Sequence, residues 1–210
     1  MHIKKLAEIL EEEYIPNKGI ISIGSSKEGI RLFKEIVLRC EEKNKEIILI
    51  PTSIEQSIVA REYDIKIMDF NDVLPDLGIE FSNEIDFYKN FNKLETKSLI
   101  KDRILAYFSK KLIIYSEERP KERIGKEILV EVSHFGWKKT KSILSTYGDV
   151  EFYKKSEGGH YLFKVKLYET MSYTDIENII NVPGVIEHSL FINYADVVFF
   201  KEKNKLVMMK

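Results

Sequence analysis

Short apolar runs alternate with amphipathic segments over residues 19–70, and this alternation limits the possible folds more than any other feature of the chain. The apolar runs are GIISIG at 19–24, EIILIP at 46–51 and DIKIMDF at 64–70. The segments between them carry apolar residues at helical spacing. Neighbouring parallel strands need such crossovers, so the pattern predicts βαβ units and an α/β fold with a Rossmann-like, mostly parallel sheet. Ligands of these sheets bind at the carboxyl ends of the strands.

The order of elements changes after Gly125. Patterning there predicts strand, helix, two strands, helix and strand, at 128–133, 135–147, 150–155, 161–167, 172–181 and 184–192. This βαββαβ order is that of a ferredoxin-like α+β unit. We therefore expect a Rossmann-like catalytic domain of residues 1–126 and 193–210, and a smaller ferredoxin-like domain of residues 127–192. In the first of these, a strand at 195–200 and a hairpin partner at 205–209 are expected.

Charge balance and residue usage argue against several classes of partner. Lys plus Arg is 33 and Asp plus Glu is 34, so net charge gives no reason to expect nucleic acid or an anionic membrane. Cys40 is the only cysteine, which excludes a disulfide or a thiolate cluster within one chain. The histidines, His2, His134, His160 and His188, lack metal-ligand spacing, and His188 is expected at a strand surface. An acid-rich amphipathic N-terminal segment and the lack of an apolar run of about 18 residues predict a cytoplasmic protein.

Three carboxylates follow an apolar run in IEFSNEID, residues 79–86: Glu80, Glu84 and Asp86. Acids at the end of a strand can form an ordinary solvated turn. They can also hold a polar substrate at the mouth of a sheet. The local pattern leaves both possibilities open.

The loop SIGSSKEG, residues 22–29, follows a predicted strand and begins a predicted helix, so its amides could bind a phosphate. It matches neither GxGxxG nor the P-loop, and Glu28 would repel a phosphate. Ser25 and Glu28 have the spacing of a capping box, as do Ser53 and Gln56 before the next helix. A structural cap is therefore at least as well supported as a phosphate site.

The segment KSLIKDRILAYFSKK, residues 97–111, predicts a helix with Ile100, Ile104 and Phe108 on its apolar face. Asp102 then points nearly opposite that face. We expect its carboxylate to be solvated or to face a cleft.

The stretches IPTSIEQSIVAREYDI at 50–65, VPGVIEHSLFINYADVV at 182–198 and VEVSHFGW at 130–137 together resemble the ribose-5-phosphate isomerase A family. IPTSIEQSIVAREYDI at 50–65 resembles the family's P-T-S and the helix after it. VPGVIEHSLFINYADVV at 182–198 resembles its P-G-V-x-E-x-G-L-F followed by A-D-V, and VEVSHFGW at 130–137 resembles the start of its small domain. The resemblance extends over nearly the whole chain, which is identified as a divergent member.

The resemblance implies a metal-independent isomerase that interconverts ribose 5-phosphate and ribulose 5-phosphate through an enediolate. A carboxylate moves a proton between C2 and C1, polar groups stabilise the oxyanion, and a phosphate site anchors the substrate. It also implies that no cofactor is required, that the partner is a small-molecule sugar phosphate, and that the protein is a homo-oligomer.

The family's glycine loop is altered in this chain. Where the family has G-T-G-S-T for substrate binding, the chain has Gly24, Ser25, Ser26, Lys27 and Glu28. One glycine is lost and one acid is gained. The resemblance makes Ser25, Ser26, Lys27 and Glu28 candidate substrate-binding residues.

Two further motifs are partly kept. Glu80 and Asn83 stand at the two aspartates of the family's D-G-A-D-E, and Phe81 stands at its glycine, where it either fills sugar space or faces the core. Lys93 keeps the lysine of K-G-G-G, but the glycines that permit close backbone approach are lost. The resemblance makes Glu80, Asn83 and Lys93 substrate-binding candidates.

The family's general-base glutamate falls on Asp102, one methylene shorter, and a substrate-binding lysine falls on Arg119. Asp102 is therefore the catalytic candidate, and Arg119 a further substrate-binding candidate. A base displaced by about 1 Å can cost roughly 10²-fold in rate. Three functions stay open: a divergent isomerase, a non-catalytic or regulatory sugar-phosphate-binding protein on the same fold, and an enzyme for a different phosphorylated small molecule.

Overall fold

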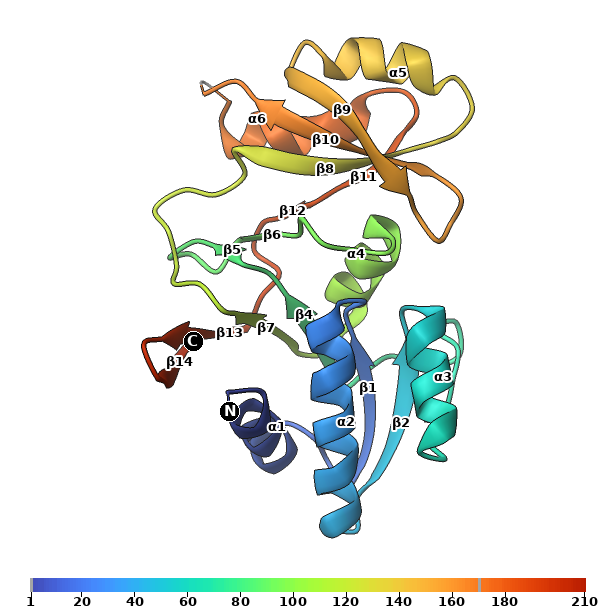
Figure 1. Ribbon diagram of the computed structural model, residues 1–210, viewed down its shortest axis with the longest axis vertical. Coiled ribbons are helices and arrows are strands. Elements are labelled where there is room, and N and C mark those ends of the chain that lie inside the picture. The colour runs from blue at the N-terminus through green and yellow to red at the C-terminus, as the bar shows by residue number, and fades with distance from the viewer. Residues whose placement is uncertain (1, 170) are drawn as a thin grey trace.

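The computed structural model describes residues 2–169 and 171–210, and its largest element is a seven-stranded sheet (Figure 1). The strand order is β14-β13-β7-β4-β1-β2-β3. The bounds are β1 Lys18–Ile23, β2 Glu46–Pro51, β3 Lys66–Ile67, β4 Leu77–Phe81, β7 Leu112–Ser116, β13 Val197–Glu202 and β14 Lys205–Met209. All neighbouring pairs are parallel except β13 with β14. The predicted α/β fold with a mostly parallel sheet is confirmed.

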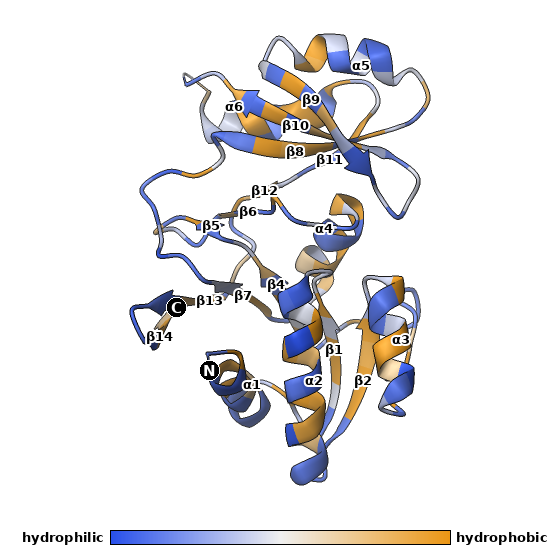
Figure 2. Ribbon diagram, viewed as in Figure 1, coloured by the Kyte–Doolittle hydropathy of each residue, from blue (hydrophilic) through white to orange (hydrophobic). Residues whose placement is uncertain are grey.

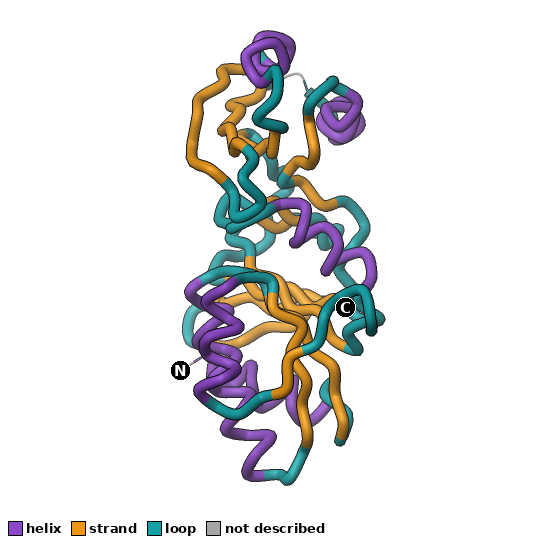
Figure 3. Tube along the Cα trace, turned by 90° about the vertical axis from the view of Figure 1, so that its right-hand side faces the viewer, coloured by secondary structure: helices purple, strands orange, loops and turns teal. Residues whose placement is uncertain are grey.

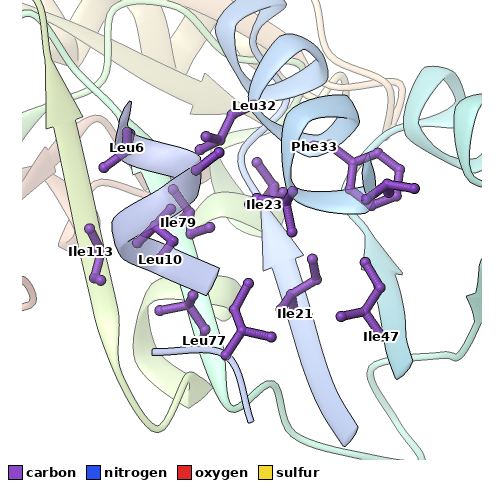
Figure 4. Close-up of a cluster of buried hydrophobic side chains, with 14 of the residues drawn as sticks. Leu6, Leu10, Ile21, Ile23, Leu32, Phe33, Ile47, Leu77, Ile79 and Ile113 are labelled. Atoms are coloured by element: carbon purple, nitrogen blue, oxygen red, sulfur yellow. The ribbon is translucent and has the colours of Figure 1, made fainter. Parts of the chain in front are cut away.

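Helices cover both faces of this sheet. On one face, Leu6 and Leu10 of α1 (His2–Glu13) and Phe33 of α2 (Lys27–Glu42) pack in one cluster with strand residues such as Ile21 and Ile79 (Figure 4). On the other, α4 (Leu99–Phe108) joins a cluster with β7 and β13. The remaining crossover helix is α3 (Ile54–Glu62). Because β4 and β7 are buried along their whole length, they are apolar at most positions rather than alternating (Figure 2). Among the helices in the described ranges, none combines the length and apolar character needed to cross a membrane.

A second, four-stranded antiparallel sheet has the order β11-β8-β10-β9. Along the chain its elements are β8 (Glu127–Val132), α5 (Trp137–Leu144), β9 (Gly148–Lys155), β10 (Tyr161–Leu167), α6 (Tyr173–Glu177) continued by the 3₁₀ turn η1 (Asn178–Asn181), and β11 (Val185–His188). This is the predicted βαββαβ order. The two main sheets lie at opposite ends of the molecule (Figure 3). The division into domains 1–126 with 193–210 and 127–192 stays a prediction.

A small third sheet, which the patterning does not predict, lies between the other two (Figure 1). It consists of β5 (Glu84–Ile85), β6 (Phe91–Asn92) and β12 (Leu190–Phe191). The strand expected at 184–192 is thus divided between two sheets. His188, expected at a strand surface, is buried instead, because α4 packs on β11.

Two helix starts were predicted from side-chain spacing, and one of them is displaced. Ser53 caps α3 as predicted, since its side chain accepts a hydrogen bond from the Gln56 amide at 3.3 Å. The α2 cap is Ser26 rather than Ser25, with its hydroxyl accepting from the Gly29 amide at 3.0 Å. Ser25 accepts from the Lys97 amide at 3.1 Å. This hydrogen bond links the glycine loop to the chain segment just before α4.

Candidate active site

The carboxyl ends of β4 and β7 and the start of α2 border a cleft of about 470 Å³. Its lining includes three aromatic rings and four carboxylates: Ser26, Glu28, Phe81, Ser82, Asn83, Glu84, Asn92, Leu94, Glu95, Tyr115, Glu117 and Tyr153. This edge of a parallel sheet is where its ligands bind. Tyr153 is contributed by β9, so both main sheets contribute to the cleft.

A buried ion cluster formed by Glu80, Lys93 and Asp102 lies close to the cleft, next in sequence to the lining residues Phe81 and Leu94. Glu80 is on β4, Lys93 follows β6, and Asp102 is in α4. The Lys93 ammonium binds the Glu80 carboxylate and lies 3.1 Å from Asp102 Oδ2. All three side chains are at most 1% exposed. One lysine therefore joins a strand, a loop and a helix.

The position of Asp102 corrects the predicted orientation of its helix. The buried residues of α4 are Leu99, Asp102, Leu105 and Ala106. Ile104 and Phe108, expected in the core, are exposed. Asp102 is neither solvated nor part of the cleft lining. The helix has apolar residues around most of its circumference, so its orientation is decided by the partners of Asp102. These are Lys93 and the Thr96 hydroxyl, which donates to Asp102 Oδ2.

Two carboxyls share one ammonium in this cluster, so a fully ionised cluster would hold one excess negative charge away from water. Burial raises the pKa of Glu80 to about 8, outweighing the lowering effect of Lys93, and Asp102 adds to the rise. Burial likewise raises the pKa of Asp102 against the effect of Lys93. Burial lowers the pKa of Lys93, but Asp102 and Glu80 raise it above its ordinary value. Burial therefore favours a proton on the pair of carboxyls in this cluster at neutral pH.

Gly24 allows the Glu80 carboxylate to lie against the loop that begins α2. A Cβ atom added at Gly24 would collide with Glu80 Oε2 and its carboxyl carbon. Only glycine permits this approach. The one glycine that the loop keeps before the helix is thus needed by a residue of the buried cluster.

The charged side chains that line the cleft are all acidic. Glu28, Glu84, Glu95 and Glu117 line it, and among the described lining residues none is Lys or Arg. Within residues 2–169 and 171–210 no three His, Cys, Asp or Glu side chains are grouped so that they could hold a metal ion. Carboxylates spread in this way repel a phosphate at close range.

The predicted site residues fall into three groups. Ser26, Glu28 and Asn83 line the cleft. Glu80, Lys93 and Asp102 form the buried cluster, and Ser25 is buried near it. Lys27 and Arg119 are exposed and outside the lining.

Arg119 is occupied elsewhere, because it forms an ion pair of 2.8 Å with Glu202 on the edge hairpin β13–β14. The structure therefore does not bring Arg119 together with the cleft residues.

Three residues near the site were not singled out from the sequence. Tyr115 follows the apolar run of residues 112–114 near the carboxyl end of β7, and that position in the sequence is a usable indication. Burial raises its pKa to about 12, with Glu117 and Glu28 adding to the rise. Thr96 and Tyr153 gave no local indication, since their roles depend on contacts between distant segments.

The acids of IEFSNEID have separate environments. Asp86 is a buried turn residue that accepts hydrogen bonds from the amides of Tyr88 and Asn90 and from the Tyr173 hydroxyl. Glu84 lines the cleft and binds the Asn92 side chain at 2.6 Å. Phe81, which was expected either to fill sugar space or to face the core, belongs to the core cluster and also lines the cleft.

Comparison with known sequences matches this chain to ribose-5-phosphate isomerases. A family model described as ribose 5-phosphate isomerase A (phosphoriboisomerase A) matches residues 48–205. A ribose-5-phosphate isomerase A of Bifidobacterium longum is 30% identical over 219 residues, covering 96% of this chain and 92% of the relative. Human ribose-5-phosphate isomerase is 24% identical over 226 residues, covering 99% of this chain and 72% of the relative.

Solved structures share the fold. A D-ribose-5-phosphate isomerase in complex with phospho-erythronic acid has a TM-score of 0.89 at 22% identity, covering 100% of this chain and 98% of the other. Ribose 5-phosphate isomerase A of Methanocaldococcus jannaschii also has a TM-score of 0.89, at 19% identity, with 99% and 97% covered. At these identities the likeness concerns the fold.

Proposed function

The chain belongs to the ribose 5-phosphate isomerase A family, and from this premise we propose that it interconverts ribose 5-phosphate and ribulose 5-phosphate. The observation that carries the proposal is the buried cluster, in which Lys93 holds Glu80 and Asp102 near the cleft at the sheet edge. The three residues retain the charge types that the family resemblance assigns to their positions.

The proposed base is Asp102. Its Oδ2 atom is held by Lys93 and Thr96, whereas its buried Oδ1 atom has no hydrogen-bond partner and is free to take a proton. In the forward direction Oδ1 removes the proton from C2, and the electron pair of that bond forms the C1=C2 bond of the enediolate as the C1 carbonyl becomes an oxyanion. Asp102 then returns its proton to C1, which takes the C1=C2 electron pair. The proton of the C2 hydroxyl passes to the oxyanion on C1, and the electron pair it leaves behind forms the C2 carbonyl of the ketone. The Lys93 ammonium is the positively charged group nearest the base, and its charge would stabilise the oxyanion.

Access of substrate to Asp102 requires the segment after Lys93 to move. The Lys154 ammonium donates to the Thr96 carbonyl at 2.6 Å, and the Glu157 amide donates to the Lys97 carbonyl at 2.8 Å. The β9–β10 hairpin thus holds the closed arrangement. Opening of such a segment is a common step in turnover.

For substrate binding we propose Ser25, Ser26 and Asn83, with Lys27 and Glu28 at the start of α2 and Arg119 at the outer end of β7. Lys27 and Arg119 would have to turn toward the cleft, since their side chains point to solvent or to Glu202.

The test is a coupled isomerase assay with ribose 5-phosphate in the presence of a chelator. The proposal expects turnover that the chelator leaves unchanged. Absence of turnover in both directions, with a folded protein, would remove it.

A second candidate is favoured by the acidic lining of the cleft. Four glutamates without a lining Lys or Arg suit a weakly anionic or neutral ligand better than a phosphate. The chain would then be an enzyme or a binding protein for a small molecule that carries no phosphate. Thermal-shift titration separates these candidate functions. Stabilisation by sugar phosphates without turnover supports a non-catalytic or regulatory sugar-phosphate-binding protein. Stabilisation by the unphosphorylated sugar alone supports a different ligand class.

A further inference from the structure

Two buried glutamates lie side by side on neighbouring strands of the four-stranded sheet. Glu131 on β8 and Glu187 on β11 are direct partners in the strand register. They are 0% and 7% exposed, and neither lines the cleft. Both belong to stretches, VEVSHFGW and VPGVIEHSLF, whose glutamates have no part in the proposed reaction.

Both glutamates hold the helix that carries Asp102. Glu131 Oε2 accepts a hydrogen bond from the Ile100 amide, in the first turn of α4, at 3.2 Å. Glu187 Oε1 accepts from the Arg103 guanidinium at 2.9 Å, and that guanidinium lies 3.8 Å from the centre of the Phe191 ring. The contacts lie on either side of Asp102 in the sequence. Figure 1 shows α4 between the four-stranded and seven-stranded sheets.

Glu131 takes the place of an ordinary helix cap. Ser98 is the N-cap residue of α4, but its side chain makes no capping hydrogen bond. A carboxylate at a helix N-terminus is stabilised by the free amides and the helix dipole. Like charges directly opposite each other on adjacent strands are destabilising. Arg103 offsets the charge of Glu187, whereas Glu131 Oε1 has no partner. A well-paired sheet has no structural need for a second buried acid there.

We propose that Glu131 is a positioning residue for Asp102, acting from the four-stranded sheet through the first turn of α4. The proposal rests on the proposed role of Asp102 as the base. It gives the smaller sheet a part in the reaction without contact with substrate, because a displacement of that sheet would move the base.

The charge of Glu131 also reaches Asp102. The charged groups within electrostatic range of Asp102 are Glu80 on β4, Lys93 after β6, Glu131 on β8 and Lys154 on β9. Burial raises the pKa of Asp102 most strongly, Lys93 lowers it, and Glu131 raises it further. Removing the Glu131 charge therefore lowers the pKa of Asp102.

Two substitutions separate the capping of α4 by Glu131 from the effect of the Glu131 charge on Asp102. Glu131→Gln keeps an acceptor for the Ile100 amide and removes the charge, whereas Glu131→Ala removes both. Glu127→Gln is the matched control, because Glu127 lies on the same strand in a half-exposed pair with Lys164. The measurements are the pH profile of kcat/KM, kcat and KM at the optimum, and a carbon-13 NMR titration of the Asp102 carboxyl in the full-length protein.

For Glu131→Gln we expect kcat near wild type at the optimum, with the acid limb and the Asp102 titration displaced to lower pH. For Glu131→Ala we expect kcat to fall roughly 10- to 10²-fold with KM within about twofold. The proposal is overturned if the Asp102 titration of Glu131→Gln coincides with that of wild type and Glu131→Ala keeps the wild-type kcat. If wild type shows no turnover at all, the proposed function fails and the NMR titration alone decides the role of Glu131.

Discussion

Lys93 connects the two carboxyls on which the proposed chemistry depends. Glu80 reaches it from β4 because Gly24 leaves room, and Asp102 reaches it from α4. The sequence predicted these residues as members of one site through family resemblance. It did not predict that they are buried together. Their joint burial depends on how α4 packs, and no local sequence pattern predicts that packing.

Glu80→Gln is expected to flatten the dependence of stability on pH. A carboxyl whose pKa is raised from 4.5 to about 8 binds its proton more tightly in the folded chain than in the unfolded chain. The free energy of unfolding of wild type should therefore fall, on the order of a few kcal/mol, as pH rises from about 5 to about 8. Denaturant titrations at stepped pH measure this, and most of the fall should be missing in the variant. An equal fall in both proteins would assign it to other groups.

Helix α4 is the element where sequence patterning failed most clearly. The spacing of Ile100, Ile104 and Phe108 predicted the apolar face, yet Leu99, Leu105 and Ala106 are the buried apolar residues. By contrast, runs such as GIISIG and EIILIP gave their strands correctly, because a strand buried on both faces is apolar throughout. A helix between two sheets has no single apolar stripe, so ion pairing decided its orientation.

A pair of substitutions on α4 checks the corrected orientation. Leu105→Ala should lower the free energy of unfolding by about 2–5 kcal/mol, because the side chain is fully buried. Ile104→Ala, with a side chain 37% exposed, should change it by less than about 1 kcal/mol. Denaturant unfolding of both variants gives the comparison. The reverse ranking would restore the original prediction.

In the whole molecule, the exposed face of α4 is a candidate interface for the predicted homo-oligomer. Ile104, Tyr107 and Phe108 are exposed there, and the Phe70 ring lies 6.2 Å from that of Phe108. A contiguous apolar patch of this kind often marks an interface. The fold class and the βαββαβ order followed from the sequence. This surface did not, because Ile104 and Phe108 were assigned to the core.

The oligomer prediction is tested by sedimentation velocity on wild type and on Tyr107→Lys with Phe108→Lys. We expect wild type to sediment as a homo-oligomer and the double variant to dissociate while remaining folded. Wild type that stays monomeric up to high concentration would contradict the prediction. A double variant that stays assembled would locate the interface elsewhere.

The role of Asp102 as the base is tested by comparing kcat of Asp102→Asn with kcat of Asp149→Asn. The second variant makes the same chemical change at an exposed position on β9 and serves as the control. An amide cannot take the C2 proton, so we expect Asp102→Asn to lose at least about 10²-fold in kcat, while the control keeps wild-type turnover. Unchanged turnover in a folded Asp102→Asn protein would show that another group is the base.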